Sequence, residues 1–141
     1  MTKYDCSPLI IEKYVPWLNE PLFLLQKRDH KPTIPFPGYW TSFGGIVKPP
    51  ETPKQCALRE VEEELRMRVS DEDLEFFKLY QVRKDADQHV YRIKMHSELS
   101  DLKLSEGSGM GLFLYSEIEK MALAWNANDI FRDYWNEKVK K

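Results

Sequence analysis

The chain has 141 residues, of which 42% are hydrophobic and 31% are charged. This length is enough for one domain with a hydrophobic core and too short for two ordinary domains. The composition is that of a folded globular protein, and the formal net charge of -2 argues against a general nucleic-acid binder, which would carry a strongly basic surface. We therefore expect a single domain over residues 1–141, with no stable nucleic-acid partner.

The sequence lacks the features of a membrane or secreted protein. No apolar run approaches the roughly 18 to 20 residues needed to span a bilayer. The segment MTKYDCSPLII has no long apolar core of the kind found in signal peptides. Two cysteines, Cys6 and Cys56, are too few to staple a secreted scaffold. We expect a cytoplasmic protein without membrane contact and with both cysteines reduced.

No internal repeat, low-complexity tract or linker interrupts the chain. In chain order, the sequence predicts strands within residues 8–15 and 21–29, a stiff loop with three prolines at 30–40, a short strand at 41–47, a helix at 53–66, strands within 74–82, 89–99 and 111–116, and helices within 116–121 and 128–141. Gly44 and Gly45 break the short strand at a point where the backbone can turn sharply or approach a ligand closely. Strands mixed with a few helices predict an α/β (α+β) fold with a sheet covered on both faces.

The predicted helix at 53–66 has clear start signals. Thr52 provides an N-cap, Pro53 fits the first turn, and Gln55 completes a capping box. At about 100° per residue, four apolar residues gather on one side, which we expect to be buried: Ala57, Leu58, Val61 and Leu65. Three acidic residues gather on an adjoining face: Glu60, Glu63 and Glu64.

Like charges at this spacing destabilise a helix by roughly 0.2 to 0.5 kcal/mol per pair, and the neighbouring Arg59 and Arg66 relieve only part of that cost. A bound cation would reverse the sign, because hard ions such as Mg²⁺ prefer several oxygen ligands. An acidic, water-exposed helix face is the alternative interpretation. The spacing by itself does not separate the two.

A longer pattern surrounds these acids. It reads Gly45, five residues, Glu51, seven residues, then Arg59-Glu60-Val61, one residue, Glu63-Glu64, one residue, and after Arg66 the aliphatic Met67. This pattern resembles the Nudix box, G-x5-E-x7-R-E-U-x-E-E-x-G-U, in which U is a bulky aliphatic residue. Arg66 replaces the second glycine of the box, which closes the helix, and Phe43 stands where proline is frequent. We interpret both departures as local backbone changes, because neither position supplies a metal ligand.

The resemblance is strongest over residues 22–67 and implies a Nudix-type α/β/α sandwich with a mixed β-sheet. It implies a hydrolase that cleaves a nucleoside diphosphate linked to a further group, with Mg²⁺ or Mn²⁺ as cofactor. Such a reaction requires charge neutralisation around phosphorus and an aligned water molecule. The implied metal ligands are Glu60, Glu63 and Glu64, with the carbonyl of Gly44 as an additional candidate.

The resemblance also assigns supporting roles. Arg59 would orient a carboxylate of the helix, so that Arg59, Glu60 and Glu63 form the implied catalytic set, and Glu51 would brace the loop and helix. Some family members carry a general base on the loop before the last strand, where this sequence has Glu106. A solvent-exposed loop acid is the alternative for Glu106.

Four residues are candidates for contacts with the nucleotide. Arg28 resembles an arginine at the end of a strand that contacts phosphate or base in MutT-type enzymes, with a plain surface arginine as the alternative. Asn126 lies where those enzymes keep a base-reading asparagine, and helix capping is its alternative. Tyr39 and Trp40 could stack on a base, although large aromatics more often serve in packing.

The resemblance leaves the substrate open. Sequence motifs that distinguish the subfamilies for ADP-ribose, coenzyme A, NADH or dinucleoside polyphosphates are missing. By elimination, the resemblance leads us to expect a MutT-like hydrolase of (deoxy)nucleoside triphosphates, which releases monophosphate and pyrophosphate. A nucleotide sugar is the alternative substrate. The alternative class is a noncatalytic Nudix module that binds a nucleotide or RNA as a sensor. Family members are often dimers, and the sequence leaves a homodimer open.

Overall fold

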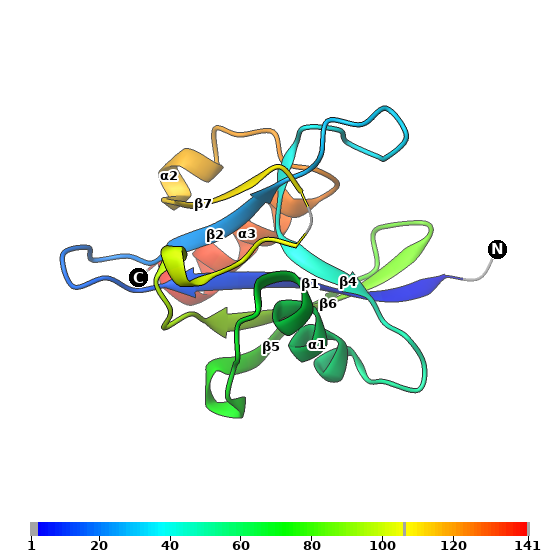
Figure 1. Cartoon of the computed structure of the whole chain (residues 1–141), viewed down its shortest axis with the longest axis horizontal. Coiled ribbons are helices and arrows are strands. Elements are labelled where there is room, and N and C mark those ends of the chain that lie inside the picture. Colours follow the sequence, from blue (N-terminus) through cyan, green and yellow to red (C-terminus); the bar gives the residue numbers. More distant parts are fainter. Residues whose placement is uncertain (1–2, 106, 141) are drawn as a thin grey trace.

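The computed structural model describes residues 3–105 and 107–140, in which a seven-stranded mixed sheet is built around one long strand. This strand, β1 (Tyr4–Lys13), pairs in parallel with β6 (Ala86–Lys94) along one edge. Along its other edge it pairs antiparallel with β4 (Phe43–Ile46) through its first half and with β2 (Leu22–Lys27) through its last residues. The strands β2 and β4 therefore lie one after the other beside β1 (Figure 1).

The remaining strands extend the sheet on both sides. On one side, β2 pairs antiparallel with β3 (Trp40–Thr41) and with β7 (Gly109–Phe113). On the other side, β5 (Leu74–Tyr80) pairs antiparallel with β6 and forms the edge of the sheet. Two short 3₁₀ turns, η1 (Asp71–Asp73) and η2 (Leu99–Asp101), precede β5 and follow β6.

Helices cover both faces of the sheet, as the sequence predicts. In Figure 1, α1 (Pro53–Leu65) lies in front of the sheet and α3 (Ala127–Tyr134) lies behind it. The short α2 (Tyr115–Ile118) packs with α3, and a π-helical turn, η3 (Trp135–Val139), continues α3. The predicted α/β/α sandwich with a mixed sheet is confirmed.

Two hydrophobic cores lie on opposite faces of the sheet because successive side chains of a strand point to opposite sides. Leu9 and Ile11 of β1 contribute to the core beneath α1, whereas Ile10 between them contributes to the core beneath α3. All three are 0% exposed. The core beneath α1 includes Ala57, Val61 and Leu65, and the core beneath α3 includes Ile118, Ile130, Phe131 and Tyr134.

The start of α1 agrees with the predicted capping box. The Thr52 hydroxyl accepts a hydrogen bond from the Gln55 backbone N–H at 3.1 Å, and the Gln55 side chain accepts one from the Thr52 N–H at 2.8 Å. The helix ends at Leu65, and Arg66 adopts a left-handed backbone with φ of 54°. An arginine therefore takes the conformation in which a glycine would be unstrained.

Several boundaries differ from the sequence-based ones. The first strand starts at Tyr4, ahead of the predicted 8–15, because its polar first residues pair with β4 and β6 on both edges. The last helix ends at Tyr134 and gives way to the π-helical turn, short of the predicted 128–141. No helix among the described residues is long and apolar enough to cross a membrane.

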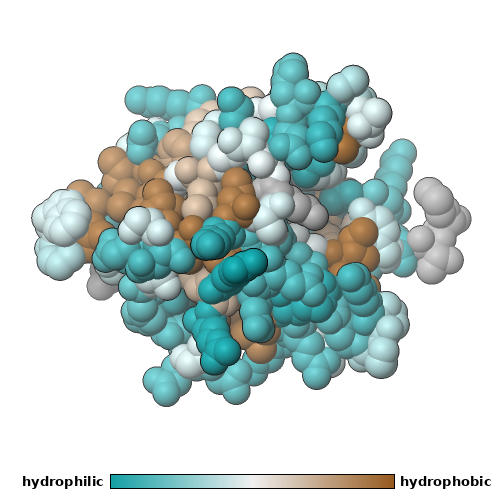
Figure 2. All heavy atoms as spheres, in the orientation of Figure 1, coloured by the Kyte–Doolittle hydropathy of each residue, from teal (hydrophilic) through white to brown (hydrophobic). Residues whose placement is uncertain are grey.

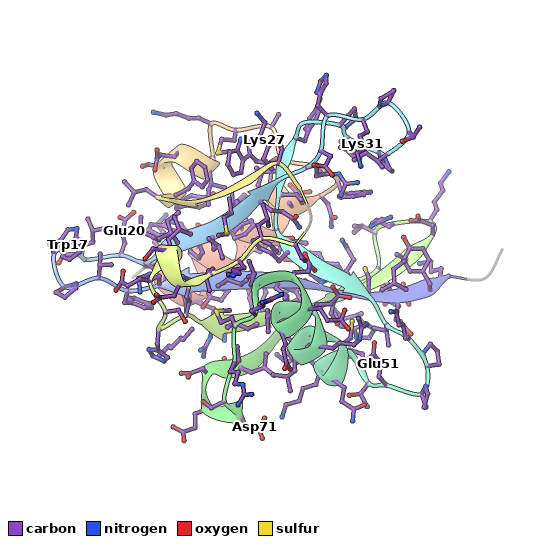
Figure 3. The ribbon with its side chains drawn as sticks, in the orientation of Figure 1. Trp17, Glu20, Lys27, Lys31, Glu51 and Asp71 are labelled. Atoms are coloured by element: carbon purple, nitrogen blue, oxygen red, sulfur yellow. The ribbon has the colours of Figure 1, made fainter. Side chains whose placement is uncertain are left out.

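The surface over α1 is largely hydrophilic (Figure 2). Glu51 lies in the loop that leads into α1, and Trp17 lies in the connection between β1 and β2 at the opposite end of the molecule (Figure 3). Trp17 is 78% exposed but is remote from the acidic helix. The acidic face of α1 and the neighbouring strand β4 thus lie far from this exposed aromatic residue.

Candidate functional site

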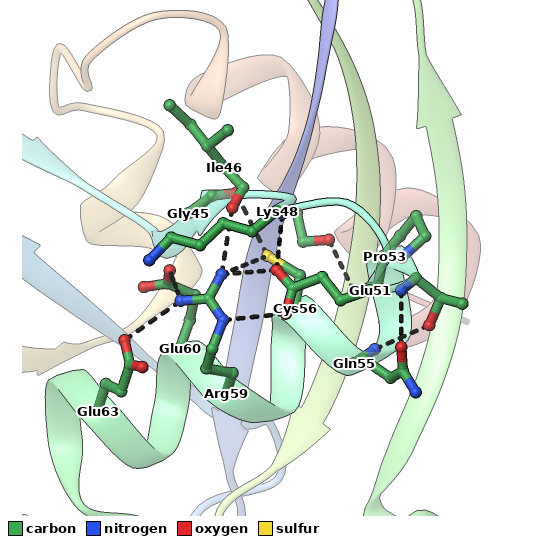
Figure 4. A network of polar contacts seen from close by, with 12 residues as sticks. Gly45, Ile46, Lys48, Glu51, Pro53, Gln55, Cys56, Arg59, Glu60 and Glu63 are labelled. Carbon is green, nitrogen blue, oxygen red and sulfur yellow. Dashed lines mark hydrogen bonds and ion pairs between the residues drawn. The ribbon is translucent and has the colours of Figure 1, made fainter.

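Arg59 is the centre of a network that ties α1 to the loop before it (Figure 4). Its guanidinium forms a bidentate pair with Glu51, with Nη2 at 2.7 Å from Oε1 and Nε at 3.0 Å from Oε2. Nη2 also donates to the carbonyl of Ile46 at 3.2 Å, and Glu51 accepts from the backbone N–H of Lys48 at 2.8 Å. Hydrogen bonds from Arg59 lower the pKa of Glu51 to about 2, and the same pairing raises the pKa of Arg59.

Two of the clustered acids also contact Arg59. Its Nη1 lies 2.8 Å from Oε1 of Glu60 and 3.2 Å from Oε2 of Glu63. The side chain of Glu60 is 14% exposed and that of Glu63 is 58% exposed. Both carboxylates therefore converge on one cationic nitrogen, which offsets their mutual repulsion.

The double glycine lets Glu60 approach β4. A Cβ built on Gly45 would lie 2.1 Å from Oε1 of Glu60, and one built on Gly44 would lie 2.4 Å from the carbonyl oxygen of Ser7. Gly44 also has a φ of 146°, a conformation that side chains rarely adopt. The predicted close approach of the backbone is thus made to a carboxylate of α1 and to the neighbouring strand β1.

The third clustered acid lies at a different depth. Glu64 is buried, with 8% exposure, whereas its neighbours Glu62 and Glu63 are exposed. The backbone carbonyl of Glu64 accepts a hydrogen bond from the N–H of Ser105 at 3.0 Å, which brings the segment before β7 against the end of α1. The candidate base Glu106 follows in sequence but lies outside the described residues, so its role stays a prediction.

The donors fit a hard divalent cation by their chemistry, since all are carboxylate or carbonyl oxygens. Arg59 Nη1 already places a positive charge within hydrogen-bonding distance of Glu60 and Glu63. No group of three or more His, Cys, Asp or Glu side chains within residues 3–105 and 107–140 is arranged to hold a metal ion as it stands. Glu60, Glu63, Glu64 and the Gly44 carbonyl therefore stay predicted ligands.

A pocket of about 240 Å³ opens on the other side of β4. Gly44 and Gly45 form part of its wall, together with residues of β1, β2 and β6 and of the segment that leads into α3. It contains two of the four candidate nucleotide contacts, Arg28 and Asn126. None of the described residues that line it is acidic, and two, Arg28 and Arg83, are basic.

Trp125 is one of the aromatic residues that line this pocket. Two guanidinium groups lie over its ring, with Arg28 at 4.6 Å and Arg83 at 5.5 Å from the ring centroid. Arg28 is also fixed by a hydrogen bond from Nε to the carbonyl of Pro35 at 2.9 Å. Arg83 forms an ion pair with Asp85 at 2.9 Å.

The two aromatics proposed for base stacking do not line the pocket. Trp40 packs edge-on against Phe113 with ring centroids 5.0 Å apart, and Tyr39 packs against Phe36 at 5.4 Å. The alternative interpretation, packing, therefore describes both. The sequence-based reasoning missed Trp125, which stands directly before Asn126 in the sequence.

Asn126 forms a reciprocal amide pair with Gln88 of β6. Gln88 Nε2 donates to Asn126 Oδ1 at 2.9 Å, and Asn126 Nδ2 donates to Gln88 Oε1 at 2.8 Å. Asn126 stands at the N-cap position of α3, but its side chain makes no capping hydrogen bond. Asn128 closes the preceding turn instead, accepting from the Leu123 N–H and donating to the Met121 carbonyl, both at 2.8 Å. Asn126 therefore occupies the N-cap position that the capping alternative predicts, but its side chain pairs with Gln88 instead of capping the helix.

Both cysteines are free and buried, and Cys6 lines the pocket. Burial raises the pKa of each thiol to about 11. A thiol with so high a pKa is not a thiolate near neutral pH and is a poor nucleophile. The chemistry of the site therefore rests on its carboxylates, guanidinium groups and amides.

A NUDIX domain model matches residues 15–134, and the chain belongs to the Nudix family. A comparison with curated proteins finds no match to this sequence.

Solved structures of the same fold agree with this assignment. A MutT/nudix family protein from Enterococcus faecalis superposes with a TM-score of 0.81 at 18% identity, over 100% of this chain and 64% of the Enterococcus chain. The MutT protein of Methanosarcina mazei Go1 gives 0.73 at 21% identity, over 98% of this chain and 96% of that one. The NUDIX domain of Shewanella oneidensis NrtR, solved with ADP-ribose, gives 0.77 at 16% identity, over 96% of this chain and 88% of that one.

Proposed function

We propose that this protein hydrolyses the pyrophosphate bond of a nucleoside diphosphate linked to another group, in a reaction that requires Mg²⁺ or Mn²⁺. A (deoxy)nucleoside triphosphate is the leading substrate, with monophosphate and pyrophosphate as products. The observation that supports the proposal is that the pocket and the acidic helix share one wall. Gly44 and Gly45 line the pocket, and Gly45 lies directly against the Glu60 carboxylate. A nucleoside in the pocket would direct its phosphates across β4 toward that carboxylate.

The pocket suits the nucleoside end of such a substrate. Its volume of about 240 Å³ is below the roughly 300–1,000 Å³ typical of sites for drug-sized ligands, which suits a base rather than a whole nucleotide. Arg28 and Arg83 supply positive charge beside the ring of Trp125, and Asn126 supplies an amide for a base edge. No carboxylate among its described lining residues would repel the anionic substrate.

The acidic helix suits the phosphate end. Glu60, Glu63, Glu64 and the Gly44 carbonyl would hold the divalent ion, which when bound neutralises phosphate oxygens and makes a water molecule more acidic. Arg59 orients the Glu60 carboxylate through the hydrogen bond at 2.8 Å, and Glu51 fixes Arg59. Glu106 is the candidate that accepts the proton of the attacking water.

A second candidate function is that of a noncatalytic module that binds a nucleotide. The observation that favours it is that Arg59 already compensates part of the charge of Glu60 and Glu63 without a metal. The NrtR domain that shares the fold was solved with ADP-ribose, which also keeps a nucleotide sugar open as the alternative ligand.

Hydrolysis assays separate these candidates. The purified protein is incubated with Mg²⁺ and a panel of nucleoside triphosphates and nucleotide sugars, and both products are quantified. We expect turnover of at least one nucleotide, and the substitution Glu63→Gln should lower kcat/KM by about 100-fold or more. Because the Glu63 side chain is 58% exposed, the free energy of unfolding should change by no more than about 0.5 kcal/mol.

The matched control is Glu62→Gln, the same chemical change at the exposed preceding residue, which should keep full activity. Full activity in Glu63→Gln would refute the metal assignment. Tight nucleotide binding by the wild type without turnover in the presence of Mg²⁺ or Mn²⁺ would favour the binding module.

A further inference from the structure

The amide pair of Gln88 and Asn126 joins two residues that lie 38 positions apart in the sequence. Gln88 comes from β6 and is 3% exposed, and Asn126 comes from the turn before α3. Both residues nevertheless line the pocket, so the pair is part of its wall. Gln88 is buried and Asn126 is partly buried, so polar groups of the pair that face the pocket cost free energy unless a ligand or water pairs with them.

Each amide keeps hydrogen-bonding capacity after the pair has formed. A primary amide has two N–H donors and two acceptor lone pairs. The hydrogen bonds at 2.9 and 2.8 Å use one donor and one lone pair of each residue, so one of each remains on both. In a reciprocal pair, the oxygen of one residue lies beside the nitrogen of the other. Each edge of the pair therefore presents one acceptor and one donor side by side.

The pair has two equivalent arrangements. If both amide groups turn by half a revolution, both hydrogen bonds form again, and every edge exchanges its donor for an acceptor. Turning only one amide would set two oxygens or two N–H groups against each other and break both bonds. Within the described residues, neither side chain forms a hydrogen bond with a third residue that would favour one arrangement.

The two arrangements match the two kinds of purine. Guanine presents the O6 acceptor beside the N1–H donor, and adenine presents the N6 donor beside the N1 acceptor. We propose that Gln88 and Asn126 form a two-state amide reader that accepts both 6-oxo and 6-amino purines. This inference rests on the proposed function, which places the base in this pocket. A reader with a fixed donor and acceptor would reject one purine strongly, because a buried polar group would stay unpaired.

Binding of mononucleotides tests the reader without any need for turnover. Calorimetry with adenosine and guanosine 5′-monophosphates, in the absence of metal, should give wild-type Kd values within about tenfold of each other. The two binding free energies would then differ by less than the contribution of one well-formed hydrogen bond. A preference of more than tenfold for either nucleotide overturns the inference, and this measurement needs no variant.

Two isosteric variants fix the reader in opposite arrangements. In Gln88→Glu, position 88 can only accept a hydrogen bond from the base, so the donor to the base has to come from Asn126. In Asn126→Asp, position 126 can only accept, so the donor to the base has to come from Gln88. The ratio of the two Kd values should shift by about tenfold or more in opposite directions in the two variants. Repulsion between the new carboxylate and the phosphate weakens both nucleotides alike and cancels in the ratio.

The matched control is Gln55→Glu, the same change at an exposed residue of α1 where a glutamate can still complete the capping box. It should leave the ratio unchanged. Ratios that stay constant in both pocket variants, or that shift in the same direction, overturn the reader while the proposed hydrolase stands. Failure of the wild type to bind either nucleotide overturns the reader together with the base pocket of the proposed function.

Discussion

Arg59 carries more of the site's polar contacts than any single acidic residue. It binds Glu51 in bidentate fashion, donates to the Ile46 carbonyl, and contacts both Glu60 and Glu63. The planar guanidinium, with five N–H donors, can serve this many acceptors at once, and a lysine could not. The acidic cluster is therefore tolerable in the folded chain because one arginine neutralises part of it.

The pairing of Glu51 with Arg59 predicts a distinct acid sensitivity. The folded-state pKa of Glu51 is about 2 and its ordinary value is 4.5, so the pair contributes stability above pH 4.5 that is lost as the pH falls toward 2. Glu51→Gln keeps the shape but removes the charge. We expect the variant to be less stable at neutral pH and to lose less stability between pH 4.5 and 2, as measured by urea unfolding across that range. Parallel pH curves for the two proteins would contradict this account, and Glu62→Gln serves as the control.

At the scale of elements, α1 shows a local conflict at its end. The helix terminates with Arg66 in the left-handed conformation, its N–H bonded to the carbonyls of Glu62 and Val61. The backbone therefore follows the course that a glycine would favour, even though the residue is an arginine. The departure from the family box changes the energy of this turn rather than its geometry.

Arg66→Gly is expected to stabilise the protein. In the folded wild type, the left-handed backbone of a non-glycine residue costs roughly 1–2 kcal/mol, and glycine removes this strain. Glycine also makes the unfolded chain more flexible, which offsets part of the gain, so the free energy of unfolding should rise by about 1 kcal/mol. Denaturant unfolding at neutral pH measures it. The control is Arg68→Gly, an exposed position without a positive φ, where glycine should be neutral or destabilising. A loss of stability in Arg66→Gly would show that the arginine side chain makes contacts that outweigh the backbone strain.

At the scale of the whole molecule, β1 connects the strands on its two edges and the hydrophobic cores on both faces of the sheet. It pairs with three strands, and its alternate side chains enter the two cores on opposite faces of the sheet. Neither core can lose its packing without disturbing the strand that the other core also uses. We therefore expect the two layers to unfold together.

Two adjacent substitutions test this coupling. Ile10→Val trims the core beneath α3, and Ile11→Val trims the core beneath α1, and both side chains are 0% exposed. Each should lower the free energy of unfolding by about 0.5–1.5 kcal/mol. Tryptophan fluorescence and far-ultraviolet circular dichroism should follow one coincident transition in both variants. Separate transitions for the two probes would indicate that the layers unfold independently.

Local signals predicted much of this structure. The capping box of Thr52 and Gln55, the apolar face of α1 and the spacing of Glu60 and Glu63 all involve residues within a few positions of each other. Strand positions followed from composition, but the start of β1 did not, because polar residues there are held by pairing on both edges. The family box indicated the acidic helix and gave Arg59 the role of orienting one of its carboxylates.

By itself, the sequence determined the family, the layered fold and the acidic face of α1, since periodicity and caps act over one or two turns of chain. The sequence indicated Arg28 and Asn126 as nucleotide contacts, but only the tertiary structure decided which other residues line the pocket with them. Trp125 contacts the guanidinium groups of Arg28 and Arg83, and Gln88 pairs with Asn126, so side chains from distant parts of the chain come together there. Such contacts depend on the pairing and twist of the sheet, and no spacing along the sequence encodes them.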